Sequence, residues 1–242
     1  FEAWHRANVV PHRARGYAIV NLSLKAPGIA PGDLTADQMD RVADLAERYS
    51  LGELRVSHRQ NLVFPDVRQA DLPALWGALQ GLSLATPNIG QLTDIIACPG
   101  LDYCSLANAR AIPVAQDISR HFGDSAVLED VGELTINISG CMNACGHHHV
   151  GHIGILGVEK NGQEFYQLTL GGSSGEDASL GDRLGRSISA AEVPPAIEAI
   201  VARYRELRVD GERFLDTYRR VGLAPFKDAV YGAGGEHSRA VA

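Results

Sequence analysis

The four cysteines of this 242-residue chain constrain its fold more than any other feature of the sequence. Cys98 and Cys104 form a C-x5-C pair, Cys141 and Cys145 form a C-x3-C pair, and 36 residues separate the two pairs. The rest of the chain contains no cysteine. Two closely spaced pairs of thiols indicate that the fold brings two separate segments together at one shared site.

Three kinds of site use such a set of thiols. Disulfides need an oxidising compartment, and a domain of this size does not need them for stability. Structural zinc sites more often use C-x2-C pairs, which turn both sulfurs towards one metal. An iron–sulfur cluster spreads its irons over several ångströms and takes one thiolate per iron, so ligands arrive from separate directions. The spacing therefore favours a cluster over zinc, and zinc over disulfides.

The residues next to the cysteines agree with a cluster. Pro99 follows Cys98 directly, and Gly100, Gly140 and Gly146 lie close to the thiols. Glycine lets a backbone N–H group approach sulfur closely, and such hydrogen bonds tune the potential of a cluster.

A group of histidines follows the second cysteine pair, namely His147, His148, His149 and His152. Consecutive side chains point in different directions, so the triplet cannot chelate one metal together, and the thiols already make a set of four. We therefore expect these imidazoles to hydrogen-bond an anionic group or nearby backbone, and we disfavour a separate histidine metal site.

The first part of the chain follows a β-α-β-β-α order. Residues 17–24 have the β-branched and aromatic content of a strand, and residues 34–50 carry a helical apolar stripe. Residues 53–67 alternate as two short strands, and residues 71–82 form a second amphipathic helix opened by a proline. This order predicts a ferredoxin-like half-domain over residues 1–86.

The second part, residues 87–226, mixes strands and helices. Apolar spacing is helical between Cys104 and Phe122, where Pro113 either kinks the helix or starts a new one. We further predict a strand, a hairpin that turns at Asn161-Gly162, and two closing helices, over residues 133–140, 152–172, 189–208 and 211–222. The fold class is thus α+β, with a mixed sheet in this part and a tail without regular order over 227–242.

Composition excludes some partners. The net charge is −7 and the pI is near 5.7, whereas binding to nucleic acid relies on clustered Lys and Arg, so we expect no nucleic-acid partner. The chain has no apolar run of the roughly 18 to 20 residues that a spanning helix needs, so we expect no membrane partner. Because the chain begins at Phe1, we expect it to be a piece of a longer product.

Two segments resemble a known family. The segments ACPGLDYCSLANAR (97–110) and INISGCMNACGHHHVGHIGILG (136–157) are similar to the cluster signature of the sirohaem-dependent nitrite and sulfite reductases, in spacing and in flanking Asn and Gly. Residues 52–67, 168–172 and 211–222 resemble further parts of the C-terminal half of these enzymes.

The resemblance implies two cofactors. A [4Fe-4S] cluster would be held by Cys98, Cys104, Cys141 and Cys145, and Cys145 would also bridge to the iron of sirohaem. Asn143 matches a family position near the macrocycle. The second domain, over residues 87–226, would then be the one that binds the cluster and sirohaem.

A second motif matches the family in the first domain. Arg55, Arg59, Gln60 and Asn61 occupy the second copy of a motif whose first copy contacts sirohaem. By this resemblance they bind the cofactor or face a vestigial counterpart of its site, and the alternative is that they are solvated charges at a strand end. No catalytic residue is assigned.

The resemblance implies the cluster-bearing half of a cytoplasmic, assimilatory sulfite or nitrite reductase, an oxidoreductase. Its expected partners are the N-terminal half of the same enzyme, a ferredoxin or flavoprotein electron donor, and a small anion as substrate. We expect the fragment alone to be inactive and, when made in air, largely without either cofactor. The alternatives are an iron–sulfur electron-transfer module without sirohaem and a zinc-stabilised binding domain.

Overall fold

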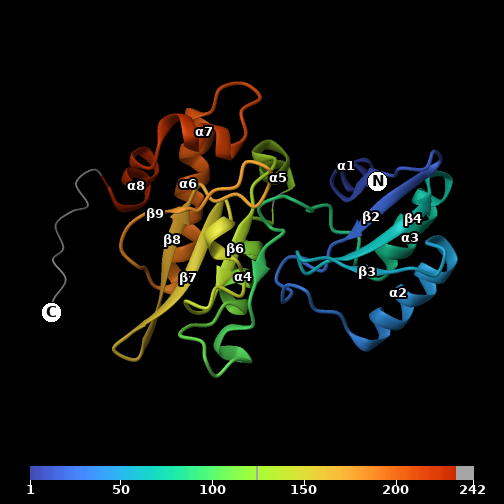
Figure 1. The fold of residues 1–242 in the computed structure, drawn as a ribbon, viewed down its shortest axis with the longest axis horizontal. Coiled ribbons are helices and arrows are strands. Elements are labelled where there is room, and N and C mark those ends of the chain that lie inside the picture. The colour runs from blue at the N-terminus through green and yellow to red at the C-terminus, as the bar shows by residue number, and fades with distance from the viewer. Residues whose placement is uncertain (124, 233–242) are drawn as a thin grey trace.

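The computed structural model describes residues 1–123 and 125–232, which form two lobes lying side by side (Figure 1). We call the part from α1 (Glu2–Asn8) to α3 (Leu72–Gly81) the first lobe, and the part from Leu92, through β5 (Ile96–Ala97), to α8 (Ala224–Tyr231) the second lobe. Each lobe has its own cluster of buried apolar side chains.

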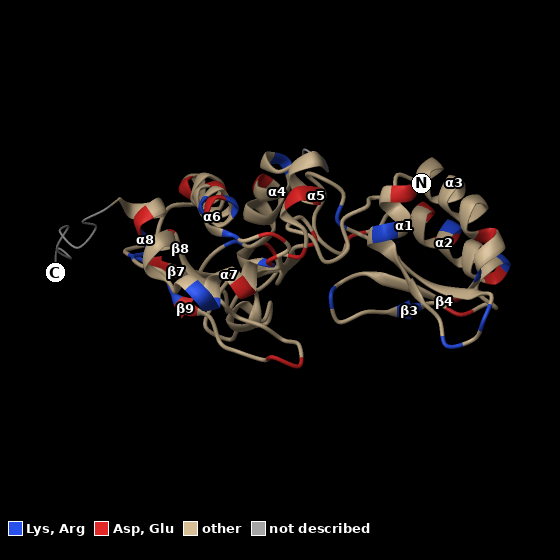
Figure 2. Cartoon of the chain, turned by 90° about the horizontal axis from the view of Figure 1, so that it is seen from above, with Lys and Arg blue, Asp and Glu red and all other residues tan. Residues whose placement is uncertain are grey.

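An antiparallel sheet forms the base of the first lobe. Its strand order is β1-β2-β4-β3, with β1 Val9–Pro11, β2 Tyr17–Leu22, β4 Leu62–Arg68 and β3 Arg55–Val56. Along β2, every second residue is fully buried, as expected for a strand with one face on a core. The helices α2 (Ala36–Tyr49) and α3 lie on one side of this sheet (Figure 2).

The predicted helix over 34–50 is confirmed, and its start has a clear chemical cause. The Thr35 hydroxyl accepts a hydrogen bond from the Gln38 backbone N–H, and the Gln38 side chain accepts one from the Thr35 backbone N–H. This reciprocal pair satisfies two amides that the first helical turn leaves without partners.

The second lobe contains a mixed sheet in the order β5-β6-β7-β8-β9. The strands β5, β6 (Ile136–Ser139) and β7 (Ile153–Lys160) run parallel, whereas β8 (Gln163–Leu170) and β9 (Asp182–Arg183) are antiparallel to their neighbours. All four residues of β6 are buried, as expected for a central parallel strand. The helices α4 (Ile112–His121) and α6 (Val193–Leu207) lie along the same side of the sheet, and α5 (Ser125–Val131) and α7 (Phe214–Val221) complete the lobe.

The predicted α+β class, with a ferredoxin-like half and a mixed second sheet, is confirmed. The hairpin turn is also confirmed, since Asn161 and Gly162 have φ values of 55° and 75°, the left-handed pair that a tight hairpin requires. Pro113 stands in the first turn of α4 and therefore begins this helix. The helices α1 and α5 were not predicted.

One expectation is partly wrong. The tail over 227–242 was expected to lack order, but α8 continues to Tyr231. Phe226 is fully buried in the core of the second lobe, and Tyr231 packs against the same core. These two side chains anchor the helix. Residues 233–242 lie outside the described part of the chain.

None of the helices in the described residues combines the length and the apolar content that crossing a membrane requires.

Candidate metal centre

The parallel strands β5 and β6 explain how two distant cysteines meet. Cys98 directly follows β5, and Cys141 follows β6 after one glycine. Neighbouring parallel strands end at the same edge of a sheet, so the segments that leave them start side by side. The Cys98 backbone N–H donates to the Ile138 carbonyl of β6 at 3.0 Å, which joins the first of these segments to the second strand.

The two cysteine loops, residues 98–104 and 140–145, are in direct contact. The Gly140 backbone N–H donates to the Cys98 Sγ atom at 3.0 Å. A Cβ atom added at Gly140 would lie 2.5 Å from the Ala109 carbonyl oxygen and 2.9 Å from the Gly100 Cα atom. The loops therefore pack backbone against backbone, which only glycine permits at this point.

The four thiols differ in exposure. Cys98 and Cys141 are buried, Cys104 is half-buried and Cys145 is exposed, and all four are free thiols. Among the described residues, no three His, Cys, Asp or Glu side chains converge closely enough to hold a single metal ion.

Polar side chains of β6 hold the segment that follows Cys145. The Asn137 side-chain amide donates to the Gly146 and His147 carbonyls at 3.0 and 3.3 Å, and the Ser139 hydroxyl accepts from the Gly146 N–H at 3.1 Å. His147 has a φ of 54°, in the left-handed region. These contacts turn the chain sharply and fix His147 beside Cys145.

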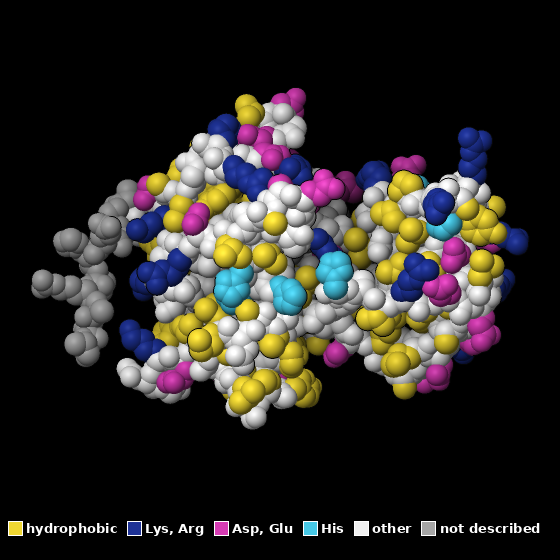
Figure 3. Space-filling view, in the orientation of Figure 1, with side chains coloured by type: hydrophobic (Ala, Val, Ile, Leu, Met, Phe, Trp, Pro, Cys, Tyr) yellow, Lys and Arg dark blue, Asp and Glu magenta, His cyan; other side chains and the backbone are white. Residues whose placement is uncertain are grey.

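A pocket of about 300 Å³ opens next to Cys145, at the junction of the lobes. Its wall is formed by His58, Arg59, Gln60, Ile96, Thr135, Asn137, Cys145, His147, Val150 and Ser174. No carboxylate stands among these residues of the described chain. Exposed histidine side chains lie on one face near the boundary between the lobes (Figure 3).

Arg59 gives this pocket its positive charge. In the described part of the chain, its guanidinium forms no ion pair and no hydrogen bond, unlike Arg55 in the same lobe, whose Nε atom contacts Glu53 at 2.5 Å. An unpaired guanidinium in a pocket without carboxylates is suited to bind an anion, and a carboxylate in particular.

A second pocket of about 520 Å³ continues from the first and shares five of its residues, including His58, Arg59 and Thr135. His152 lies in its wall, and its Nδ1 atom accepts from the Thr135 backbone N–H at 3.3 Å. Burial lowers the pKa of His152, and the charges of Arg59 and Arg213 lower it further, although Glu133 opposes this. The ring is therefore neutral near pH 7, with its proton on Nε2.

The predicted site residues separate into two groups. Arg59, Gln60 and Cys145 line the first pocket, so the structure brings together residues that are 85 positions apart. Arg55 lies on the exposed strand β3 and is paired with Glu53. Asn143 stands in the exposed turn between the second pair of cysteines, outside the pocket.

Asn61 has a structural position. Its side chain is only 3% exposed, accepts a hydrogen bond from the Leu24 N–H and donates one to Asp94 at 3.0 Å. It therefore belongs to the packing between the lobes and does not line the pocket.

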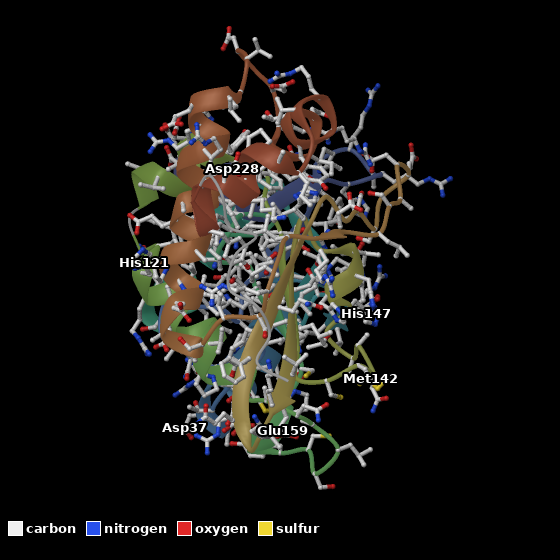
Figure 4. All side chains as sticks on the ribbon, turned by 90° about the vertical axis from the view of Figure 1, so that its left-hand side faces the viewer. Asp37, His121, Met142, His147, Glu159 and Asp228 are labelled. Carbon is white, nitrogen blue, oxygen red and sulfur yellow. The ribbon has the colours of Figure 1, made fainter. Side chains whose placement is uncertain are left out.

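Sequence reasoning missed several pocket residues. His58 and Ser174 were not assigned to the site, although His58 directly precedes Arg59 within the segment 52–67 that resembles the family. His147 was grouped with its neighbours, but only the structure separates their roles. Figure 4 places His147 and Met142 on one side of the second lobe, opposite His121 of α4.

His148, by contrast, is 2% exposed, and its Nδ1 atom has no hydrogen-bond partner among the described residues. Burial, with a smaller contribution from the neighbouring His149, lowers its pKa to about 4. The ring is therefore neutral near pH 7 and belongs to the buried packing of the second lobe.

Comparisons with known protein families agree with this division of the chain. Residues 14–82 match the family described as "Nitrite/Sulfite reductase ferredoxin-like half domain", and residues 90–236 match "Nitrite and sulphite reductase 4Fe-4S domain".

Curated relatives include an assimilatory ferredoxin-dependent nitrite reductase of Haloferax mediterranei, which is 33% identical over 77% of this chain and 33% of its own length. A ferredoxin sulfite reductase of Mycolicibacterium paratuberculosis is 30% identical over 79% of this chain and 36% of its own length. The chain thus spans about a third of the length of these relatives.

Solved structures show the same likeness. The Mycobacterium tuberculosis NirA protein superposes with a TM-score of 0.74 and 27% identity, over 91% of this chain and 41% of that one. A dissimilatory sulfite reductase I superposes with a TM-score of 0.73, over 88% of this chain and 69% of that one; at 12% identity this shows a shared fold.

Proposed function

Because the chain belongs to the nitrite and sulphite reductase family, we propose that it is the cluster-bearing C-terminal half of an assimilatory sulfite or nitrite reductase. The observation that carries this proposal is the arrangement at the edge of the second sheet. Two loops with four free thiols pack together there, and Cys145 stands in the wall of a pocket that contains an unpaired arginine.

Cys98, Cys104, Cys141 and Cys145 would hold a [4Fe-4S] cluster. The donor set fits this group, because four thiols without disulfides supply one ligand for each iron. The contact between Gly140 and Cys98 adds a hydrogen bond from a backbone N–H group to sulfur, and such bonds stabilise the negative charge of a thiolate. The buried position of Cys98 and Cys141 would limit access of solvent to the iron.

The pocket beside Cys145 would hold part of sirohaem. The Arg59 guanidinium and the ring N–H groups of His58 and His147 would bind its carboxylates, and the exposed thiol of Cys145 would bridge to its iron. When bound, cluster and sirohaem supply single electrons for the six-electron reduction of sulfite to sulfide, or of nitrite to ammonia. Neutral His152 would donate a hydrogen bond from its Nε2–H group to an acceptor in the adjoining pocket.

Partners follow from the relatives. Several are named as ferredoxin-dependent enzymes, so we propose ferredoxin as the electron donor, with a flavoprotein as the alternative. Since the chain spans about a third of their length, the N-terminal half of the enzyme would supply the remaining part of the anion site.

Anaerobic reconstitution of this chain with iron and sulfide tests the cluster assignment. We expect about four irons and four acid-labile sulfides per chain, and a broad absorbance shoulder that reduction bleaches. The Cys141→Ser variant is expected to lose most of this iron, whereas Ser105→Ala, next to a proposed ligand, keeps it. A colourless protein that binds zinc without sulfide would contradict the proposal.

The complete enzyme tests the reaction. We expect sulfite or nitrite reduction by the protein with both halves, and loss of this activity in Cys145→Ser. Absorbance separates the two cofactors, because sirohaem adds sharp Soret and long-wavelength bands to the cluster shoulder. A cluster spectrum without these bands would instead support an electron-transfer module.

A further inference from the structure

Gln60 has an unusual backbone conformation at the junction between the lobes. Its φ is +57°, in the left-handed region that residues with a Cβ atom rarely adopt. Such a conformation persists only where the surroundings hold it, and it often marks a functional position. Gly32 makes room for it, because a Cβ at Gly32 would lie 3.3 Å from the Gln60 Cβ atom.

The side chain of Gln60 crosses from the first lobe to the second. Its Nε2 atom donates to the Ala97 carbonyl oxygen at 2.7 Å, and its Oε1 atom accepts from the Ala97 N–H at 3.0 Å. Ala97 is the last residue of β5, which is an edge strand of the mixed sheet. The amide therefore pairs with the open edge of this strand as a neighbouring strand would.

The loop that carries Gln60 is itself held firmly. The Ser57 hydroxyl accepts hydrogen bonds from the backbone N–H groups of Arg59 and Asn61, both at 3.2 Å. The buried Lys25 ammonium donates to the Arg59 carbonyl oxygen at 2.6 Å and to Asp94 at 2.7 Å. Since the loop cannot shift easily, its contact with Ala97 restrains the strand end.

We propose that Gln60 is a positioning residue, which couples the pocket wall at Arg59 to the cysteine loop that begins at Cys98. By holding both polar groups of Ala97, its amide fixes the point at which the chain leaves β5, and hence the direction of the next side chain. The importance of this restraint for catalysis rests on the proposed function, in which Cys98 is a cluster ligand. The restraint itself is a property of this chain without any cofactor.

Selective labelling of the reduced, cofactor-free chain tests this coupling. Cys98 is buried, so iodoacetamide reaches it only when its loop opens, and peptide mass spectrometry reports each cysteine separately. In Gln60→Gly the left-handed backbone is retained without strain, but both hydrogen bonds to Ala97 are lost. We expect the labelling rate of Cys98 to rise about tenfold or more, as the loss of two hydrogen bonds predicts, while the rate of Cys141 stays within twofold.

Two further variants serve as controls. Gln116→Ala removes a different contact between the lobes, the hydrogen bond from its Nε2 atom to the Gly28 carbonyl at 3.1 Å, and should leave Cys98 as in the parent chain. Gln60→Glu keeps an acceptor for the Ala97 N–H but loses the donor, so its labelling rate should be intermediate. Circular dichroism of each variant shows that it is folded.

The outcomes are distinct. An unchanged rate at Cys98 in Gln60→Gly would overturn the proposal, as would an equal rise at Cys98 and Cys141, which indicates general loosening. If Gln60→Gly does not fold, Gln60→Glu decides in the same way. Failure of the parent chain to take up a cluster would count against the proposed function but would leave the labelling result standing.

Discussion

At the scale of single residues, three consecutive side chains of one motif have three different positions. Arg59 lies unpaired in the pocket, Gln60 turns through a left-handed conformation to reach Ala97, and Asn61 is buried against Asp94. The sequence predicted cofactor binding for all three residues. The order of residues in a tight turn does not show the direction in which each side chain points. Burial and hydrogen-bond partners make the distinction.

Arg59 is expected to contribute to cofactor binding with little effect on stability. Its guanidinium has no hydrogen bond or ion pair in the described chain, so Arg59→Ala breaks no polar contact and should change the free energy of unfolding by less than about 0.5 kcal/mol. Sirohaem added to the cluster-loaded chain should bind about tenfold to a hundredfold more weakly, because a charge-assisted hydrogen bond is lost. Absorbance titration measures this.

The matched control for this prediction is Arg55→Ala, which removes an exposed arginine already paired with Glu53. Its sirohaem affinity should equal that of the parent chain. Equal weakening in both variants would mean that net charge, and not the position of Arg59, governs binding.

His148 is expected to make stability depend on pH. The pKa of this ring is lowered to about 4 from 6.5, because burial disfavours its charged form. Between pH 6.5 and 4 the unfolded chain binds a proton that the folded chain does not. The free energy of unfolding should therefore be highest above pH 6.5, fall by up to about 3 kcal/mol as pH drops to 4, and change no further through this group.

Urea denaturation at a series of pH values between 4 and 7.5 checks this dependence. His148→Gln should lose a large part of the decrease, and the remainder would include His152, whose pKa is lowered in the same direction. His147→Gln, which alters an exposed ring, should retain the full decrease. A slope in His148→Gln equal to that of the parent chain would contradict the assignment.

At the scale of elements, the cysteine pairs meet because β5 and β6 are parallel neighbours. The sequence predicted the strand around β6 and the hairpin of β7 and β8, since their periodicity is local. It could not predict that a two-residue strand before Cys98 pairs with β6 some forty residues later, because so short an element has no periodicity of its own. The closeness of Gly100 and Gly140 follows from that pairing.

Gly140→Ala is expected to separate the cysteine loops. The added methyl group would lie 2.5 Å from the Ala109 carbonyl oxygen, which is backbone and cannot rotate away. We expect the free energy of unfolding to fall by about 1 to 3 kcal/mol, the usual cost of overpacking, with lower iron content after reconstitution. Urea denaturation and iron analysis measure the two effects.

Gly77→Ala is the control for Gly140→Ala, because it is expected to stabilise the chain. Gly77 stands exposed within α3, with open space where a Cβ would lie, and alanine favours helix. The free energy of unfolding of this variant should rise by about 0.5 to 1 kcal/mol, and the variant should bind iron as the parent chain does. Iron binding by Gly140→Ala at the parent level would show that the loops tolerate the extra group.

At the scale of the whole molecule, the two apolar cores are separate, and buried polar contacts join the lobes. Lys25 and Asp94, 2% and 0% exposed, form an ion pair at 2.7 Å across this junction. Burial lowers the pKa of Lys25, while the charge of Asp94 opposes this shift. Pairs 37 and 69 residues apart, Gln60 with Ala97 and Lys25 with Asp94, are invisible to local patterns, so the sequence predicted two domains but not their connection.

The last prediction concerns this junction. Asp94 accepts hydrogen bonds from Lys25, the Asn61 amide and the Gly90 N–H, so Asp94→Ala leaves a buried cation without its counter-charge and two donors without a partner. We expect a loss of about 3 to 5 kcal/mol in the free energy of unfolding. The double variant Lys25→Met with Asp94→Leu removes the unpaired charge and should lose clearly less than Asp94→Ala alone. It should still fall below the parent chain, because the Asn61 and Gly90 donors stay unpaired.

Arg6→Ala is the matched control, since it breaks an ion pair between the lobes whose side chains, Arg6 and Glu129, are 62% and 53% exposed. Solvent screens such a pair, so its loss should cost less than about 1 kcal/mol. Urea denaturation followed by tryptophan fluorescence compares all variants, because Trp4 is buried in the core of the first lobe. If Asp94→Ala cost no more than Arg6→Ala, burial of the Lys25 pair would not be what joins the lobes, and the exposed contacts would have to carry that role.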